Sequence, residues 1–283
     1  LVTKYVNIGN DWTRIDSPQS LSQFVFGTKA QTLERLQSIV SEAIILDQVR
    51  FSALEWDENP EAVMGRITEA IPKVHLVVRS SAYNEDTWGQ SQAGVYHSEL
   101  DVEGNNPAVL KKAIDAVCDS FVSINGSNTL RDEVFVQAHL DDVVMSGVLF
   151  TRNPETGAPY VAINYDDTSS TTDTVTSGKG RDLSTLIVYK YEKLAFLGNK
   201  YISHLMKVVN ELEGLLGHDA LDIEFAFDSS DKCYLLQVRA LTGYGSGVEI
   251  TDVDVDEELN SIDDYVGKLL RFKSPLLGKK TIL

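Results

Sequence analysis

Beyond Arg131 the chain is a succession of strand-like segments separated by short turns, and this pattern constrains the fold more than any other feature. Segments with the alternation and composition of strands recur at 133–140, 143–151, 159–165, 185–190, 221–228 and 233–240. Turn sequences such as "NPETGAP" and "DSSDK" stand between them. We therefore predict that this half is a largely antiparallel sheet, accompanied by one long helix at about 200–216.

The first half mixes helical and strand-like patterns. Helical periodicity behind a capping residue predicts helices at 28–40, at 52–71 with an interruption near Pro60, and at 105–122. Short strands are predicted at 43–47, 75–80 and 95–102. The chain as a whole is therefore expected to belong to the α+β class.

The domain organisation follows from this change in character. Residues 1–140 are predicted to form a first lobe and residues 141–242 a second, with a hinge near residues 137–141. Beyond Thr242 come a glycine-rich "GYGSG", an acidic run and a short amphipathic piece, which indicate a linker at 243–283. The polar stretch at 166–181 is long for a connection, and it is either disordered or a mobile lid.

Composition and charge exclude several classes of protein. The chain has 283 residues and a formal net charge of -17, which argues against nucleic-acid binding because that binding depends on clustered Lys and Arg. An anionic ligand would have to be held by a few concentrated positive groups. No apolar run is long enough for a membrane span, and the N-terminus lacks a signal-peptide pattern. Cys118 and Cys233 have no metal or redox spacing, so we interpret them as reduced core thiols of a cytoplasmic protein.

The segments "LDIEFAFD" and "CYLLQVRA" carry the clearest polar constellation. Asp222 and Glu224 share one face of the first strand, and Gln237 and Arg239 share one face of the second, opposite Leu236. A short turn joins the segments, so all four polar side chains could line one side of a hairpin. Two carboxylates at this spacing are suitable Mg²⁺ ligands, and an arginine beside them suits phosphate. Alternatively, this is the solvated face of an antiparallel sheet, where such residues only pair with each other.

The stretch "VVRSSAYNEDTWGQSQAG" is the second candidate for a binding site. An arginine, Arg79, ends a buried strand and is followed by small residues whose backbone could approach phosphate oxygens: Ser80, Ser81, Gly89, Ser91 and Gly94. Lys29 stands at a helix start, a position that also suits a phosphate oxygen. The alternatives are a surface loop in which Arg79 pairs with Glu85 or Asp86, and a lysine that is only solvated.

Together these segments resemble the nucleotide-binding domain of the pyruvate phosphate dikinase and phosphoenolpyruvate synthase family. The matching pieces occur in family order: "FGTKAQTLERL", "VVRSSAYNEDTWGQSQAGVYHSELDV", "EVFVQAHL", "SGVLFTRNPETGAPYVAINY" and "LDIEFAFDSSDKCYLLQVRALT". They cover most of residues 26–242. The resemblance implies an ATP-grasp-type fold that binds ATP and Mg²⁺ between two lobes.

The resemblance also implies roles for individual residues. Lys29 and Arg79 would contact the phosphates, and the loop at 79–94 would close over them. Glu224 and Gln237 would hold Mg²⁺ and phosphate oxygens, with Asp222 and Arg239 close by and Arg79 and Arg239 as the catalytic cations. The hinge would bind adenine through its backbone, at Gln137, Ala138, His139 and Leu140.

Two departures from the family pattern limit what this chain can do alone. Where many members carry Gly-Leu-Gly-Glu, this chain has "NYDDTSSTTDTVTSG". The family also passes a phosphoryl group to a histidine in a Gly-Gly-x-Thr-Ser-His setting, and no such motif occurs here. We therefore expect the chain to be the ATP-binding part of a longer enzyme, with a downstream phosphohistidine domain as its partner. The alternatives are a related enzyme that phosphorylates a sugar, glucan or antibiotic, and a module that only senses nucleotide.

Overall fold

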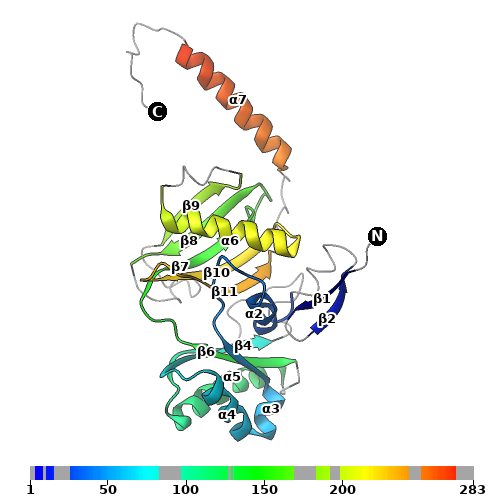
Figure 1. The fold of residues 1–283 in the computed structure, drawn as a ribbon, viewed down its shortest axis with the longest axis vertical. Coiled ribbons are helices and arrows are strands. Elements are labelled where there is room, and N and C mark those ends of the chain that lie inside the picture. Colours follow the sequence, from blue (N-terminus) through cyan, green and yellow to red (C-terminus); the bar gives the residue numbers. More distant parts are fainter. Residues whose placement is uncertain are drawn as a thin grey trace.

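The structure is a computed structural model that describes residues 4–8, 11–15, 26–82, 97–126, 129, 131–168, 183–191, 198–241 and 250–271. Within these residues the chain forms two larger antiparallel sheets, each with its own helices, and a helix that extends away from them (Figure 1). A separate two-stranded hairpin, β1 (Lys4–Ile8) and β2 (Asp11–Ile15), lies near the N-terminus. The predicted α+β class is confirmed.

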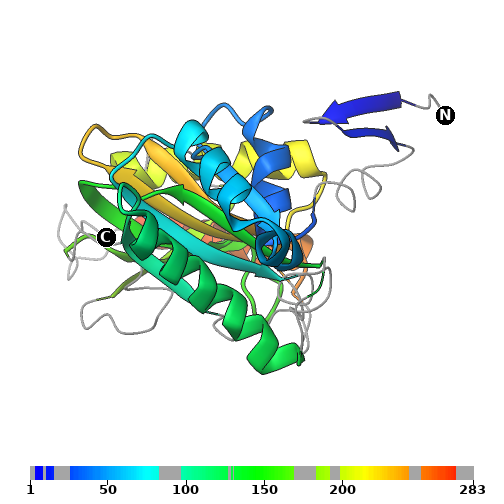
Figure 2. The ribbon, with the colours of Figure 1, turned by 90° about the horizontal axis from the view of Figure 1, so that it is seen from below.

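The first lobe is a four-stranded sheet covered on one face by helices. Its strands follow the order β3 (Gln48–Ser52), β6 (Asp132–Ala138), β4 (His75–Ala82) and β5 (Ser98–Glu103). The helices α3 (Ala53–Glu58), α4 (Pro60–Ala70) and α5 (Pro107–Asn125) lie across it, as Figure 2 shows from below. Each helix begins at a capping side chain, respectively Ser52, Asn59 and Asn106. The predicted helices at 52–71 and 105–122 are therefore confirmed, with the interruption at Asn59.

Alternation along β4 and β6 decides which side chains remain for a binding site. Leu76 and Val78 of β4, and Val134 and Val136 of β6, belong to the core beneath the helices. The residues between them point to the opposite face, because successive strand residues alternate. That opposite face carries Val77, Arg79 and Ser81 of β4 and Glu133, Phe135 and Gln137 of β6.

The second lobe is a five-stranded antiparallel sheet with one long helix, as predicted. Its strands follow the order β11 (Cys233–Ala240), β10 (Leu221–Asp228), β7 (Val143–Phe150), β8 (Tyr160–Asp166) and β9 (Ser184–Tyr189). The helix α6 (Lys200–Leu216) packs its apolar side on the sheet core and ends at Gly217, which has a positive φ of 59°. Gly147 is required in β7, because a Cβ there would meet the Asn164 carbonyl oxygen at 2.3 Å.

The helix α2 (Lys29–Gln37) joins the two lobes. It begins at Thr28, as predicted, and contacts β11 of the second sheet as well as β3, β4 and β6 of the first. Its buried residues Leu33 and Leu36 belong to the core of the second lobe. Its first turn is therefore held at the junction between the two sheets.

Two predicted elements differ from the structure. The predicted strand at 43–47 is wrong: only Ile44 pairs, in an isolated parallel bridge to Tyr234. The acidic run predicted as part of a linker instead begins a 20-residue helix, α7 (Asp252–Arg271). Thr251 and Asp254 cap this helix reciprocally, and acidic residues in a first turn are favourable beside the positive end of the helix dipole.

Cys118 and Cys233 are both buried free thiols, which confirms them as core residues. Burial raises the pKa of each thiol to about 12, so neither is a reactive thiolate near neutral pH. No helix within the described parts of the chain is long and apolar enough to span a membrane.

Candidate functional site

The polar faces of the two lobes meet at Arg79 and Glu224. Arg79 lies in β4 of the first sheet and Glu224 in β10 of the second, and Nη1 of Arg79 is 4.0 Å from Oε2 of Glu224. Each side chain keeps 18% of its surface exposed. A cation and a carboxylate that face each other across two lobes can bind the anionic and metal-bound parts of one ligand.

The hairpin of β10 and β11 places the predicted polar residues opposite each other. Asp222 pairs with Arg239, and Glu224 pairs with Gln237. Nε and Nη2 of Arg239 lie 2.8 and 2.7 Å from Oδ2 of Asp222. The prediction that all four side chains share one side of a hairpin is confirmed in this register.

Leu236 was placed incorrectly by simple alternation. Glu224 pairs with Gln237 while the next residue of β10, Phe225, pairs with Leu235, so Leu236 is left as the extra residue of a bulge. Leu236 therefore packs with Ala226 in a small apolar cluster instead of joining the main core. The alternation rule, applied to the segment "CYLLQVRA", does not indicate that Leu236 is an extra residue.

Each of the two residue pairs of the hairpin matches a different one of the two interpretations, a binding site and a solvated sheet face. Asp222 and Arg239 pair with each other, as expected for a solvated or structural face. Glu224 instead approaches Arg79 of the other lobe, as expected for a site between lobes. The Asp222–Arg239 pair can thus position the ribbon, while Glu224 and Arg79 face the space that a ligand would share.

The first turn of α2, which carries Lys29, is fixed on both sides. The Ala30 amide donates to Oγ of Ser81 at 2.9 Å, and the Thr28 hydroxyl donates to Oε2 of Glu133 at 2.6 Å. The structure therefore holds Lys29 at a helix start, where the dipole favours anions. Ser80 and Ser81 are fully buried in β4, so the prediction that they form a loop around phosphate is wrong. Gly89, Ser91, Gly94 and most of the predicted 79–94 and 166–181 loops lie outside the described residues.

Glu133 is a supporting residue that the sequence reasoning missed. Its Oε1 accepts from Gln31 at 2.9 Å and lies 2.7 Å from Nη1 of Arg50, in addition to the bond from Thr28. A carboxylate at the start of a buried strand, in "RDEVFVQ", was the available signal. Glu133 thus ties the first turn of α2 to the first sheet.

A Glu133→Ala variant tests this role. We expect the free energy of unfolding to fall by about 1.5 kcal/mol, because the change removes the acceptor of the Thr28 and Gln31 side chains and one of the two carboxylates bound to Arg50. The measurement is chemical denaturation. The matched control is Glu34→Ala, which removes the more exposed partner of the same Arg50 and should cost less than about 0.5 kcal/mol. Equal losses in the two variants would contradict this role for Glu133.

The hinge at 137–140 lies beside a small apolar cluster. Val143, Ala226, Tyr234 and Leu236 form this cluster, and Leu140 packs against it. Ala226 lies two residues after Glu224 in β10 and therefore shares its face. The hinge, the apolar cluster and Glu224 are thus arranged along one side of the second sheet.

The hinge backbone is partly occupied by contacts within the first lobe. The His139 amide donates to the His75 carbonyl at 2.9 Å, and Ala138 pairs with Leu76. The buried Gln137 side chain donates to the Leu46 carbonyl at 3.5 Å and to Oε1 of Gln48 at 3.4 Å. The Gln137 side chain therefore ties the predicted hinge segment to residues 46 and 48.

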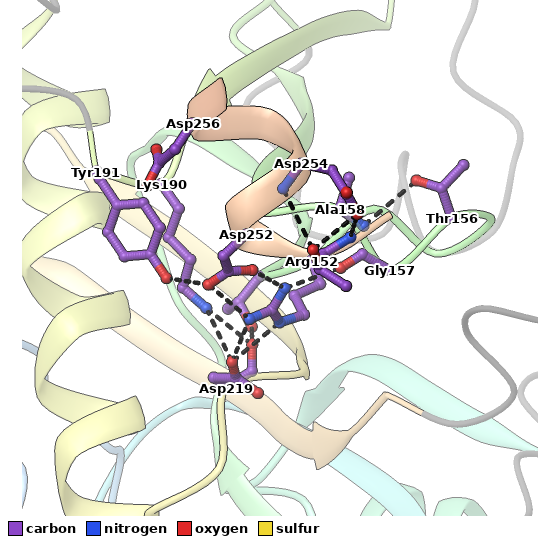
Figure 3. Close-up of polar contacts among 12 residues, drawn as sticks. Arg152, Thr156, Gly157, Ala158, Lys190, Tyr191, Asp219, Asp252, Asp254 and Asp256 are labelled. Atoms are coloured by element: carbon purple, nitrogen blue, oxygen red, sulfur yellow. Dashed lines mark hydrogen bonds and ion pairs between the residues drawn. The ribbon is translucent and has the colours of Figure 1, made fainter. Parts of the chain in front are cut away.

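A second charged cluster lies just before the start of β10, around Asp219, and the sequence reasoning did not identify it. Arg152 is bound to Asp219 through Nη2 at 2.6 Å and to Asp252 of α7 through Nη1 at 2.8 Å (Figure 3). The hydrogen bond from Arg152 lowers the pKa of Asp252. Burial acts to raise the pKa of Asp219, but the bonds and charge of Arg152 outweigh it and the pKa is lowered. This cluster fixes the base of α7 and belongs to no predicted site.

Comparison with known proteins identifies the sequence pattern. Residues 31–166 match the pyruvate phosphate dikinase AMP/ATP-binding domain, which confirms the resemblance seen in the sequence. No curated protein matches the chain. The family match and the two-lobed architecture together confirm an α+β, ATP-grasp-type fold.

Solved structures also match the chain at low identity. The D-Ala:D-Ser ligase VanG from Enterococcus faecalis is 12% identical, with a TM-score of 0.41 over 83% of this chain and 54% of the ligase. A protein from Pyrococcus horikoshii Ot3 is 14% identical, with a TM-score of 0.48 over 80% of this chain and 98% of that protein. An L-amino acid ligase from Bacillus licheniformis is 14% identical, with a TM-score of 0.42 over 76% and 42%. The chain thus spans about half the length of the VanG ligase.

Proposed function

Because residues 31–166 carry the AMP/ATP-binding domain pattern of the pyruvate phosphate dikinase family, we propose that this chain binds Mg-ATP between its lobes and donates a phosphoryl group. In this proposal the acceptor is a histidine on a separate swivelling domain, as in phosphoenolpyruvate synthases and pyruvate phosphate dikinases. The observation that carries the proposal is the approach of Arg79 and Glu224 from opposite lobes.

The side chains on either side of this contact suit a triphosphate. Arg79 comes from the first sheet, Arg239 from the second, and Lys29 from the helix start that joins them. The net charge of -17 makes such a local concentration of cations necessary for an anionic ligand. Planar guanidinium groups bind phosphate oxygens in pairs, so Arg79 would orient the phosphates in addition to attracting them. Arg239, whose Nε and Nη2 contact Asp222, would add its positive charge.

The available oxygen ligands suit Mg²⁺. Glu224 offers a carboxylate and Gln237 an amide beside it, while Asp222 lies two pairs further along the hairpin. In the described residues no group of three or more His, Cys, Asp or Glu side chains could hold a metal ion. The donors Glu224, Gln237 and Asp222 match an ion that takes one or two carboxylates and completes its shell with phosphate oxygens and water. When bound, Mg²⁺ would neutralise charge on the phosphates.

The hinge and its apolar cluster suit an adenine ring. Leu140 packs on Ala226 and Leu236, which form an apolar cluster on the side of the sheet that carries Glu224. Because the His139 amide is already bound to His75, the hinge contacts with adenine would come from the remaining backbone groups of residues 137–140. Backbone groups can distinguish adenine from guanine, since the two rings present opposite donors and acceptors at position 6.

Calorimetric titration of the chain with ATP tests the proposal. We expect binding with Mg²⁺ to be at least about tenfold tighter than in EDTA, because the carboxylates would otherwise face the phosphates without a cation between them. We also expect ATP to bind more tightly than GTP. Equal affinity in EDTA would show that ATP binding does not require Mg²⁺. Absence of ATP binding in both conditions would overturn the proposal.

A further inference from the structure

The helix α7 leaves the body of the protein after its first turn (Figure 1). That turn is held by Asp252, which binds Arg152 and accepts from the Tyr191 hydroxyl (Figure 3). Asp256 accepts from the Tyr189 hydroxyl. Val255, between these two aspartates, is buried. The rest of the 20-residue helix therefore extends from a fixed base.

An apolar stripe runs along this extended part. Val255, Leu259, Ile262 and Val266 recur at alternating spacings of four and three residues, which place them on one face of a helix. Leu259 is 37% exposed and Ile262 is 47% exposed, although large aliphatic side chains in a stripe of this spacing normally pack against a second helix. Leu259 and Ile262 thus present partly exposed apolar side chains on one face of the extended helix.

We propose that this stripe, Leu259 to Val266 on α7, is a docking surface for a basic amphipathic helix. The residues that flank an apolar stripe decide which helix can pair with it, because they meet the flanking residues of the partner. On α7 these flanking residues are Asp256, Glu258, Asp263 and Tyr265, so three of the four are acidic. A partner with Lys or Arg at the corresponding positions would form ion pairs along both edges of the apolar contact.

The same charges argue against pairing between two copies of this chain. In either orientation of two α7 helices, the flanking acids of one copy would meet those of the other, and like charges facing each other are unfavourable. The whole helix is acidic, with Asp252, Asp254, Asp256, Glu257, Glu258, Asp263 and Asp264 against Lys268 and Arg271. The negative charge also disfavours an anionic membrane surface as the occupant.

A pair of designed peptides tests the proposal on the full 283-residue chain. The probe is a fluorescent four-heptad peptide with Ile and Leu in its stripe and Lys at all flanking positions, and the second peptide differs only in having Glu there. We expect fluorescence anisotropy to show binding of the Lys peptide at least about tenfold tighter than binding of the Glu peptide. Equal binding of the two, or no binding of the Lys peptide, would overturn the proposal.

Variants of α7 separate the stripe from its flanks. Ile262→Ser should weaken binding of the Lys peptide at least about tenfold. Val253→Ser is the matched control, because Val253 is apolar and 64% exposed but lies outside the stripe, and it should leave this binding unchanged. Because Ile262→Ser can also loosen the helix, the double change Glu258→Lys with Asp263→Lys keeps the stripe and should reverse the preference toward the Glu peptide. Sedimentation should show a monomer. A dimer that Ile262→Ser dissolves would assign the stripe to a second copy and overturn the proposal.

Discussion

An Arg79→Ala variant is expected to bind Mg-ATP about 10- to 150-fold more weakly than the unaltered chain while keeping its fold. Arg79 lies on the face of β4 that looks away from the helix-covered core, so its removal leaves no cavity in that core. A charge-assisted hydrogen bond contributes roughly 1.5–3 kcal/mol, which corresponds to this range of affinity. Calorimetric titration gives the affinity, and thermal unfolding reports the stability.

The control for this variant is Arg66→Ala. Arg66 is also an arginine of the first lobe, but it forms an exposed ion pair with Glu55 on the helical face. We expect this change to leave ATP affinity within about twofold, because loss of one remote surface charge is screened by salt. If Arg79→Ala and Arg66→Ala reduced the affinity for ATP equally, Arg79 would act only through the net charge of the protein and not through a contact with ATP.

Glu224→Gln examines the other side of the same contact. The amide keeps the shape of the carboxylate but removes its charge, so it is a poorer ligand for Mg²⁺. Its effect should therefore be larger with Mg²⁺ than in EDTA, whereas the effect of Arg79→Ala should persist in both conditions. If the Glu224→Gln variant is less stable than the unaltered chain but its folded molecules bind Mg-ATP with normal affinity, Glu224 has only a structural role.

The sequence predicted the local structure of this chain well because its signals are local. Thr28, Ser52 and Asn106 cap helices where the pattern places them, and the helix at 200–216 has the predicted bounds. The short turn between the strands of the hairpin sets the pairing from Phe227–Cys233 to Phe225–Leu235, but the pairing of Asp222 with Arg239 also requires the bulge at Leu236. In each case the deciding contacts lie close together along the chain.

The features that the sequence did not predict depend on contacts between distant segments. Glu133 and Thr28 are 105 residues apart, and nothing in either segment alone indicates that their side chains meet. The burial of Ser81 depends in the same way on α2 docking against β4. Similarly, the acidic run at the start of α7 has the composition of a solvated linker. The ion pair between Arg152 and Asp252 and the helix cap formed by Thr251 nevertheless favour a helix there.

The chain, supplied with Mg-ATP and pyruvate, is expected to make no phosphoenolpyruvate and to hydrolyse ATP only slowly. Transfer in the family that this chain resembles passes through a histidine in a glycine-rich setting, and the sequence has 5 histidines, all in other settings. His75, His97 and His139 lie beside the carboxylates of Asp101, Glu99 and Asp141. His204 contacts the Glu42 carbonyl, and burial lowers the pKa of His218. None of these settings resembles that of a mobile carrier.

Addition of a separately expressed phosphohistidine domain from a phosphoenolpyruvate synthase or pyruvate phosphate dikinase tests the missing step. What remains for this chain is to position the phosphates and neutralise their charge, which accounts for most of the catalysis in phosphoryl transfer. We therefore expect the histidine of the added domain to attack the β-phosphate of ATP and displace AMP, and loss of the terminal phosphate to water then leaves a phosphohistidine and inorganic phosphate. Arg79→Ala should slow formation of both the phosphohistidine and AMP, and Arg66→Ala should slow neither. A domain whose histidine is changed to alanine is the control. Steady formation of phosphoenolpyruvate by the 283-residue chain alone would contradict the proposal, because an acceptor would then have to lie within these residues.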